Sequence, residues 1–183
     1  EAVEPAAAVA ALRALRAEAQ AVQPPPVPAA FLRQPRAGAA LHTIDLNADA
    51  GEGYDDAGLL EHVTSVNVAC GGHTGDASTM ASTVSLAVKA GAAIGAHPAY
   101  ADREGFGRKP LDTDPKLLRD QVLSQVSALQ TICCAYGTKV SYIKPHGALY
   151  HTVLKGGPQA DAVWEAAQLL DLPLLLMPTS AWA

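Results

Sequence analysis

From residue 42 onward, the pattern of hydrophobic and polar positions alternates between short β-rich runs and segments with helical spacing. Glycine or proline separates most of these segments. Short β-rich runs predict five strands, at residues 42–47, 65–70, 92–97, 140–143 and 173–177. Apolar residues at helical spacing predict helices between them, at residues 57–63, 77–90, 115–136 and 159–170. Strands that alternate with helices are typical of an α/β fold with a parallel sheet and right-handed crossovers.

Capping residues mark the ends of two of these helices. Gly91 follows residues 77–90 as a C-terminal stop. Asp114 is suited to the N-cap of the next helix, with Pro115 at its first position and Gly137 just past its end.

Residues 1–41 have a different composition. Residues 1–23 are rich in Ala, Leu, Arg and Glu and suit a short exposed helix, whereas the prolines of residues 24–41 predict an extended linker. We therefore expect an appendage over residues 1–41 and one α/β domain over residues 42–183.

Composition excludes several classes of protein. Of the 183 residues, 49% are hydrophobic and 17% are charged, which indicates a globular chain with a sizeable core. The formal net charge of -5, without a basic cluster, argues against a nucleic-acid partner. No apolar run is long enough for a membrane span, and the first residues lack a secretory pattern. Three cysteines without CxxC spacing suggest reduced thiols, so we expect a cytoplasmic protein.

Polar residues follow the predicted strands, where ligands bind in α/β sheets and barrels. Asp45, Asn47 and Asp49 alternate, so their side chains face one side of a strand. They line a wet cavity or form a satisfied hydrogen-bond network, because unpaired polar groups are costly in a core. Asp49 could instead cap the following turn, and Glu52 could be a solvated loop residue.

Three of the six histidines, His73, His97 and His146, lie at strand ends beside glycine or proline. A lone histidine is more often structural, but three equivalent positions favour a functional use. Asp49 with His73 and His97 would suit a divalent metal, or an acid–base set. The other three histidines are expected on the surface: His42, His62 and His151.

Three cationic side chains are candidates for binding anionic groups: Arg103, Arg108 and Lys144. There is an alternative for each type of residue. The arginines could belong to a surface salt-bridge cluster, and the lysine could be partly buried and paired with an acid. Cys70 has small apolar neighbours and is expected to be a buried packing thiol. The chain has neither GxxxxGK[ST] nor GxGxxG, so any ATP site is expected elsewhere.

Four segments occur in order: IDLNADAGEG, NVACGGHTGD, AIGAHPAYADREGFGR and IKPHGALY. Over residues 44–178 the chain resembles the LamB/YcsF-type family, the A subunits of prokaryotic ATP-dependent 5-oxoprolinase. With two partner subunits, these proteins convert 5-oxo-L-proline, ATP and water to L-glutamate, ADP and phosphate. The resemblance implies an irregular seven-stranded parallel β/α barrel akin to polysaccharide deacetylases and glycoside hydrolases. Here we expect an incomplete barrel, because the family continues through further βα units.

The resemblance places eleven residues on motif positions: Asp45, Asn47, Asp49, Glu52, His73, Asp76, His97, Arg103, Arg108, Lys144 and His146. Catalytic roles are predicted for Asp49, His73, His97, Lys144 and His146. Substrate binding is predicted for Asn47, Glu52, Asp76, Arg103 and Arg108. Asp49 or His73 would be the base that activates water, while Arg103, Arg108 and Lys144 would hold phosphate and carboxylate.

The resemblance also implies ATP as a co-substrate, bound mainly by the partner subunits. Two other functions remain open. One is a metal-dependent deacetylase that acts on an amide or a sugar without ATP, and the other is a non-catalytic regulatory subunit.

Overall fold

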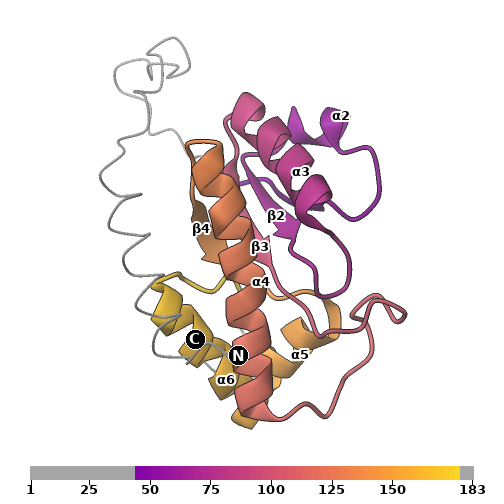
Figure 1. The fold of residues 1–183 in the computed structure, drawn as a ribbon, viewed down its shortest axis with the longest axis vertical. Helices are drawn as coiled ribbons and strands as arrows, with labels where there is room; N and C mark the ends of the chain where they lie inside the picture. Colours follow the sequence, from indigo (N-terminus) through magenta and orange to yellow (C-terminus); the bar gives the residue numbers. More distant parts are fainter. Residues whose placement is uncertain (1–43, 178–183) are drawn as a thin grey trace, which may run out of the picture.

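The computed structural model describes residues 44–177, so the predictions for residues 1–41 and for His42 lie outside the described residues. The strands are β1 (Asn47–Ala50), β2 (Ser65–Ala69), β3 (Ala93–His97) and β4 (Val140–Ile143). The helices are α2 (Ala57–Leu60), α3 (Ala77–Ala90), α4 (Pro115–Ala135), α5 (Gly147–Lys155) and α6 (Pro158–Leu170). An α/β fold is therefore confirmed (Figure 1).

The strands form one parallel sheet in the order β1-β2-β3-β4. Each crossover moves to the next strand in the same direction, so right-handed connections place the crossover helices on the same face. Figure 1 shows α4 lying along the sheet, with α3 beside its upper part and α6 beside its lower end. The other face of the sheet is left to line the site.

The core lies between the sheet and these helices. All five residues of β2 are buried, and Val66 and Val68 belong to the hydrophobic core. One stripe of α4 is fully buried: Leu118, Val122, Val126, Leu129 and Cys133. Burying a side chain of Leu or Val size stabilises a fold by about 1.5–3 kcal/mol, so this stripe fixes α4 against the sheet.

The predicted caps are confirmed. The Asp114 side chain accepts a hydrogen bond from the Leu117 backbone N–H, and Pro115 opens α4. Gly91 ends α3 in the left-handed conformation, with φ of 72°. The start of α3 holds a capping box between Asp76 and Thr79 that the sequence pattern did not predict.

The sheet is strongly curved. Asn47 on β1 donates a hydrogen bond of 2.8 Å to the hydroxyl of Tyr142 on β4, although two strands lie between them. Neighbouring strands are about 4.8 Å apart, so a flat sheet would separate these two strands by roughly 14 Å. The ring of Tyr142 crosses Gly95 on β3, where a Cβ atom would lie 2.1 Å from it. The curvature makes the face opposite the helices concave.

Several expected elements differ from the structure. The first strand is Asn47–Ala50 rather than 42–47, because β1 pairs with Ser65–Val68 only from Asn47 onward. The expected strand at 173–177 is reduced to one bridge, Ile143↔Leu174. Helix α5 was not predicted. Four strands are described within residues 44–177, so the seven-stranded barrel is not confirmed.

Candidate active site

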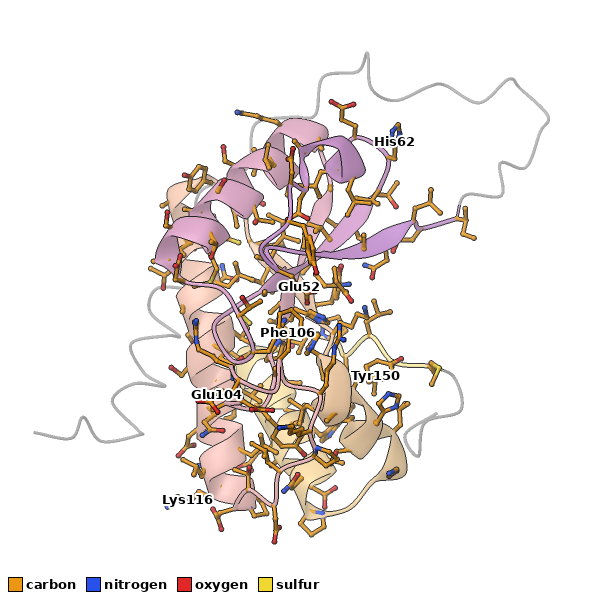
Figure 2. The ribbon with its side chains drawn as sticks, turned by 90° about the vertical axis from the view of Figure 1, so that its right-hand side faces the viewer. Glu52, His62, Glu104, Phe106, Lys116 and Tyr150 are labelled. Carbon is orange, nitrogen blue, oxygen red and sulfur yellow. The ribbon has the colours of Figure 1, made fainter. Side chains whose placement is uncertain are left out.

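Polar side chains from all four strand ends meet at one edge of the curved sheet, and the loop after β3 adds a backbone carbonyl. Figure 2 shows Glu52 and Phe106 close together at the centre of the molecule, while His62 and Lys116 lie towards its two ends. Gly107 lets the loop after β3 pack closely against the histidines. A Cβ atom at this position would lie 2.9 Å from Cβ of His73 and 3.1 Å from Cδ2 of His146.

Asp49 is held by three elements. Its Oδ1 accepts hydrogen bonds from Lys144 Nζ at 2.6 Å and from Asn67 Nδ2 at 2.7 Å. Its Oδ2 lies 3.4 Å from Nε2 of His97. Burial alone would raise the pKa of this carboxyl, but His97, Lys144 and Asn67 together hold it well below its usual range. Asp49 is therefore an ionised carboxylate with one oxygen saturated and the other facing the histidines.

Glu52 lies beside three imidazoles. Its Oε1 is 2.9 Å from His73 Nε2, 3.4 Å from His146 Nδ1 and 3.9 Å from His97 Nε2. The hydrogen bond with His73 lowers the pKa of Glu52 despite partial burial. A second carboxylate therefore stands next to Asp49 in its charged form.

His97 and His146 face each other through one nitrogen each. These two nitrogens, His97 Nε2 and His146 Nδ1, are 3.0 Å apart. On the far side of each ring, His97 Nδ1 donates to the Lys144 carbonyl at 2.6 Å, and His146 Nε2 donates to the Phe106 carbonyl at 3.0 Å. Burial is the largest cause that lowers the pKa of His146 to about 4, and any positive charge on the neighbouring imidazoles of His73 and His97 would act in the same direction. His146 is therefore a neutral imidazole near pH 7.

His73 stacks on His146 rather than facing it. The two rings are parallel within 1°, and their centroids are 3.6 Å apart. His73 Nε2 donates to the ionised Glu52, so in a neutral His73 ring the lone pair is on Nδ1. This Nδ1 is buried and has no hydrogen-bond partner among the described residues.

The structure brings six of the predicted residues into one connected network: Asn47, Asp49, Glu52, His97, Lys144 and His146. His73 joins it through Glu52. Asp45 lies at its outer end, where it accepts a hydrogen bond of 2.7 Å from Ser65. The alternation of Asp45, Asn47 and Asp49 thus places all three on the same polar face.

Asp76, Arg103 and Arg108 lie outside this network. Asp76 caps α3, and Arg103 donates a hydrogen bond to the backbone carbonyl of Gly75. The guanidinium of Arg108 lies 5.2 Å from the centre of the Phe106 ring, a cation–π contact. Both arginines are exposed, so they stand at the surface of the loops around the site.

Other sequence expectations have clear outcomes. His62 and His151 are exposed, and all three cysteines are unbridged. Cys70 is fully buried, and burial raises the pKa of its thiol to about 12, so it is a packing residue. Among residues 44–177, the structure contains no helix with the length and apolar character that crossing a membrane requires.

Sequence reasoning missed three contributors. Asn67 bridges Asn47 and Asp49, and its place directly opposite Asp49 in the neighbouring strand could have indicated this role. Tyr142 reaches Asn47 only because the sheet curves. Phe106 contributes its backbone carbonyl, held by a φ of 54° that is rare for a non-glycine residue. A carbonyl contribution has no sequence signal.

Three residues offer possible metal-ligand atoms within 4.8 Å of one another: Glu52, His73 and His146. This group differs from the predicted set of Asp49, His73 and His97, although His97 and Asp49 adjoin it.

A family model, described as the LamB/YcsF family, matches residues 44–183. The chain belongs to the LamB/YcsF family. The match includes every residue of the network described above.

Similar proteins agree with this family membership. The 5-oxoprolinase A subunit of Kocuria rhizophila is 50% identical over 146 residues, which are 75% of this chain and 58% of the relative. The 5-oxoprolinase A subunit of Nocardia farcinica is 49% identical over 140 residues, 73% of this chain and 56% of the relative. The lactam utilization protein of Thermus thermophilus is 37% identical, with a TM-score of 0.73 over 76% of this chain and 60% of that protein. The chain thus spans less than two thirds of the length of these relatives.

In this family member, the arrangement is suited to hydrolysis. The site contains two ionised carboxylates (Asp49 and Glu52), the neutral imidazole of His146 and the ammonium of Lys144. Such groups can accept a proton from water and stabilise negative charge nearby.

Proposed function

We propose that this member of the LamB/YcsF family acts as part of the A subunit in an ATP-dependent 5-oxoprolinase. It would open the lactam ring of 5-oxo-L-proline to give L-glutamate, while ATP is cleaved to ADP and phosphate. The observation that carries this proposal is the carboxylate–histidine network, found in a chain about half identical to proteins named as 5-oxoprolinase A subunits.

An unactivated amide is a poor electrophile, so ATP would phosphorylate the amide oxygen of the lactam on the partner subunits. Water then adds to the carbon that carries this phosphate and gives a proton to a base on this chain. The ring nitrogen departs from that carbon and takes up a proton to become the amine of glutamate, which leaves an acyl phosphate on the side chain. A second water molecule then hydrolyses this acyl phosphate to the carboxylate of glutamate and free phosphate. This chain would therefore provide the base, a proton donor and cationic groups.

His73 suits the role of base better than Asp49. The pKa of Asp49 is held low, so its carboxylate is a weak base near neutral pH. His73 instead has a carboxylate, Glu52, fixing one nitrogen, and in a neutral ring the other nitrogen carries a more basic lone pair; this nitrogen is buried in the structure and would act as a base only where a water molecule reaches it. This arrangement follows the logic of an oriented imidazole in hydrolases. Lys144, Arg103 and Arg108 would bind the phosphate and carboxylate of the substrate.

Reconstitution with the two partner subunits tests the proposal. We expect ATP-dependent release of glutamate from 5-oxoproline, and a loss of roughly 100-fold or more in kcat for His73→Gln, the usual scale of acid–base catalysis. His151→Gln is the matched control, because His151 is an exposed histidine. The same substitutions at aligned positions of the Kocuria rhizophila relative provide a parallel assay. Unchanged turnover in His73→Gln, with partner binding intact, would leave a non-catalytic role for this network.

A further inference from the structure

The facing nitrogens of His97 and His146 pose a problem of proton placement. A backbone carbonyl only accepts hydrogen bonds, so His97 Nδ1 and His146 Nε2 must each carry a proton to donate to Lys144 O and Phe106 O. In neutral imidazoles, the other nitrogens then carry lone pairs. These are the two nitrogens that face each other at 3.0 Å. Two lone pairs at this distance repel unless a positive species lies between them.

Two carboxylate oxygens adjoin the same point. Asp49 Oδ2 is 3.4 Å from His97 Nε2, and Asp49 Oδ1 is already occupied by Lys144 and Asn67. Glu52 Oε1 is 3.4 Å from His146 Nδ1 and 3.9 Å from His97 Nε2. Four electron-pair donors, two of them on ionised groups, therefore adjoin one another, and none of the four donates a hydrogen bond to another; among the described residues, only Glu52 Oε1 accepts one from outside the group, from His73 Nε2.

A single proton cannot satisfy all four atoms. Shared between the two nitrogens, it would leave the carboxylate oxygens at 3.4 Å or more, beyond good hydrogen-bond distance. A divalent metal ion accepts all four lone pairs at once. Ligand atoms in a tetrahedral zinc site are about 3.3 Å apart, given metal–ligand distances of about 2.0–2.1 Å. Four of the six separations among these atoms are 3.0, 3.4, 3.4 and 3.9 Å, and they scatter around that value.

We propose that Asp49, Glu52, His97 and His146 form a binding site for a divalent transition-metal ion, with Zn²⁺ as its best match. Imidazole and carboxylate ligands together suit zinc. Both histidines already make the contact that usually orients metal-ligating imidazoles, an N–H donated to a backbone carbonyl. The site does not depend on the proposed function, because it follows from atom positions in this chain alone.

His73 supports this site without binding the ion. The lone pair of an imidazole lies in the ring plane, so a bound ion lies close to the plane of each ligand ring. His73 and His146 are stacked with planes 1° apart and centroids 3.6 Å apart, so an ion in the plane of His146 is well out of the plane of His73. His73 instead donates to Glu52 and orients that carboxylate.

Metal titration of the purified 183-residue chain tests this site. After dialysis against a chelator, the chain is titrated with ZnCl₂ by calorimetry, and bound metal is measured by elemental mass spectrometry. We expect one Zn²⁺ per chain. His97→Gln and His146→Gln should each weaken Zn²⁺ binding by about 100-fold or more. Replacing a residue that only orients a metal ligand usually weakens metal binding by less, about 10- to 100-fold. Cobalt should give a visible absorption band that both variants lose.

Two controls define the ligand set. His73→Gln keeps an N–H donor for Glu52 and should weaken binding by less than about 10-fold, whereas His151→Gln should have no effect. If the buried histidine variants fail to fold by circular dichroism, Asp49→Asn and Glu52→Gln replace them, since both side chains are partly exposed.

Absence of stoichiometric metal binding would overturn the proposal, and so would ligand variants that bind Zn²⁺ as tightly as the unchanged chain. A loss in His73→Gln as large as that in His146→Gln would overturn the assigned ligand set. None of these results bears on glutamate release, so failure of this site and failure of the proposed function are distinguishable.

Discussion

Replacing Gly107 with alanine tests how closely the loop after β3 is fitted to the histidines. Gly107 has a φ of 64°, and an added Cβ would lie 2.9 Å from Cβ of His73, 3.1 Å from Cδ2 of His146 and 3.2 Å from Cβ of Ala99. Gly91 offers a matched control, because it has a φ of 72° and no atom within 4 Å of an added Cβ. The two substitutions share the backbone strain and differ in the contacts.

The backbone component is similar for both. An alanine in the left-handed region costs about 1–2 kcal/mol, and the reduced entropy of the unfolded chain offsets about 0.4–1 kcal/mol of that. Gly91→Ala should therefore lower the free energy of unfolding by about 1 kcal/mol. Gly107→Ala adds an overpacking penalty of about 1–3 kcal/mol. Cβ of His73 is joined directly to the backbone, so no rotamer change can relieve the closest contact.

Urea unfolding, followed by circular dichroism, measures both variants against the unchanged chain. We expect Gly107→Ala to be less stable than Gly91→Ala by about 1–3 kcal/mol. Under the proposed function, displacing His73 should also reduce turnover after reconstitution with the partner subunits by roughly 100-fold, the effect of a displacement of about 1 Å in an active site. Equal free energies of unfolding for the two variants would refute the close packing of this loop against His73.

Three further predictions concern other parts of the chain. The pKa of Asp49 is lowered in the fold, so its ionised form stabilises the chain above the ordinary Asp pKa of about 3.9, and this contribution is lost as the pH falls. Urea midpoints of Asp49→Asn should therefore decline less than those of the unchanged chain between about pH 5 and pH 2, and parallel declines would contradict this. Asp76→Ala removes the capping box of α3 and should destabilise the chain by about 1 kcal/mol in the same assay, whereas unchanged stability would exclude a capping role. The isolated chain should show no micromolar ATP binding by calorimetry, because its sequence lacks a phosphate-binding loop, and a tight isotherm would show that the nucleotide site is here.

Local sequence signals predicted much of the fold. The stripe from Leu118 to Cys133 and the caps at Asp114 and Gly91 are short-range features, and each lies where the sequence placed it. Helix α5 was missed because it begins at Gly147 after His146, a residue that makes no side-chain cap. The strand expected at 173–177 keeps only one bridge, since strand formation depends on pairing with distant residues.

The candidate site was predicted only in outline. Residues at the carboxyl ends of parallel strands lie at one edge, so the proximity of Asp49, His73 and His97 follows from topology. Which groups face each other depends on ring orientation, and that depends on the backbone carbonyls of Lys144 and Phe106. Sequence patterns carry no information on these carbonyl directions, so the stacking of His73 on His146 could not be predicted.

The carbonyl anchors of His97 and His146 have a consequence for redesign of the specificity of this site. Both imidazoles are oriented by the main chain at positions 106 and 144, not by the side chains there. A library that varies the side chains of Phe106 and Lys144 would alter the shape and charge around the histidines while leaving their hydrogen-bond anchors in place. The orientation of each imidazole is therefore separable from the shape of Phe106 and from the charge of Lys144, although replacing Lys144 also removes the ammonium that holds Asp49.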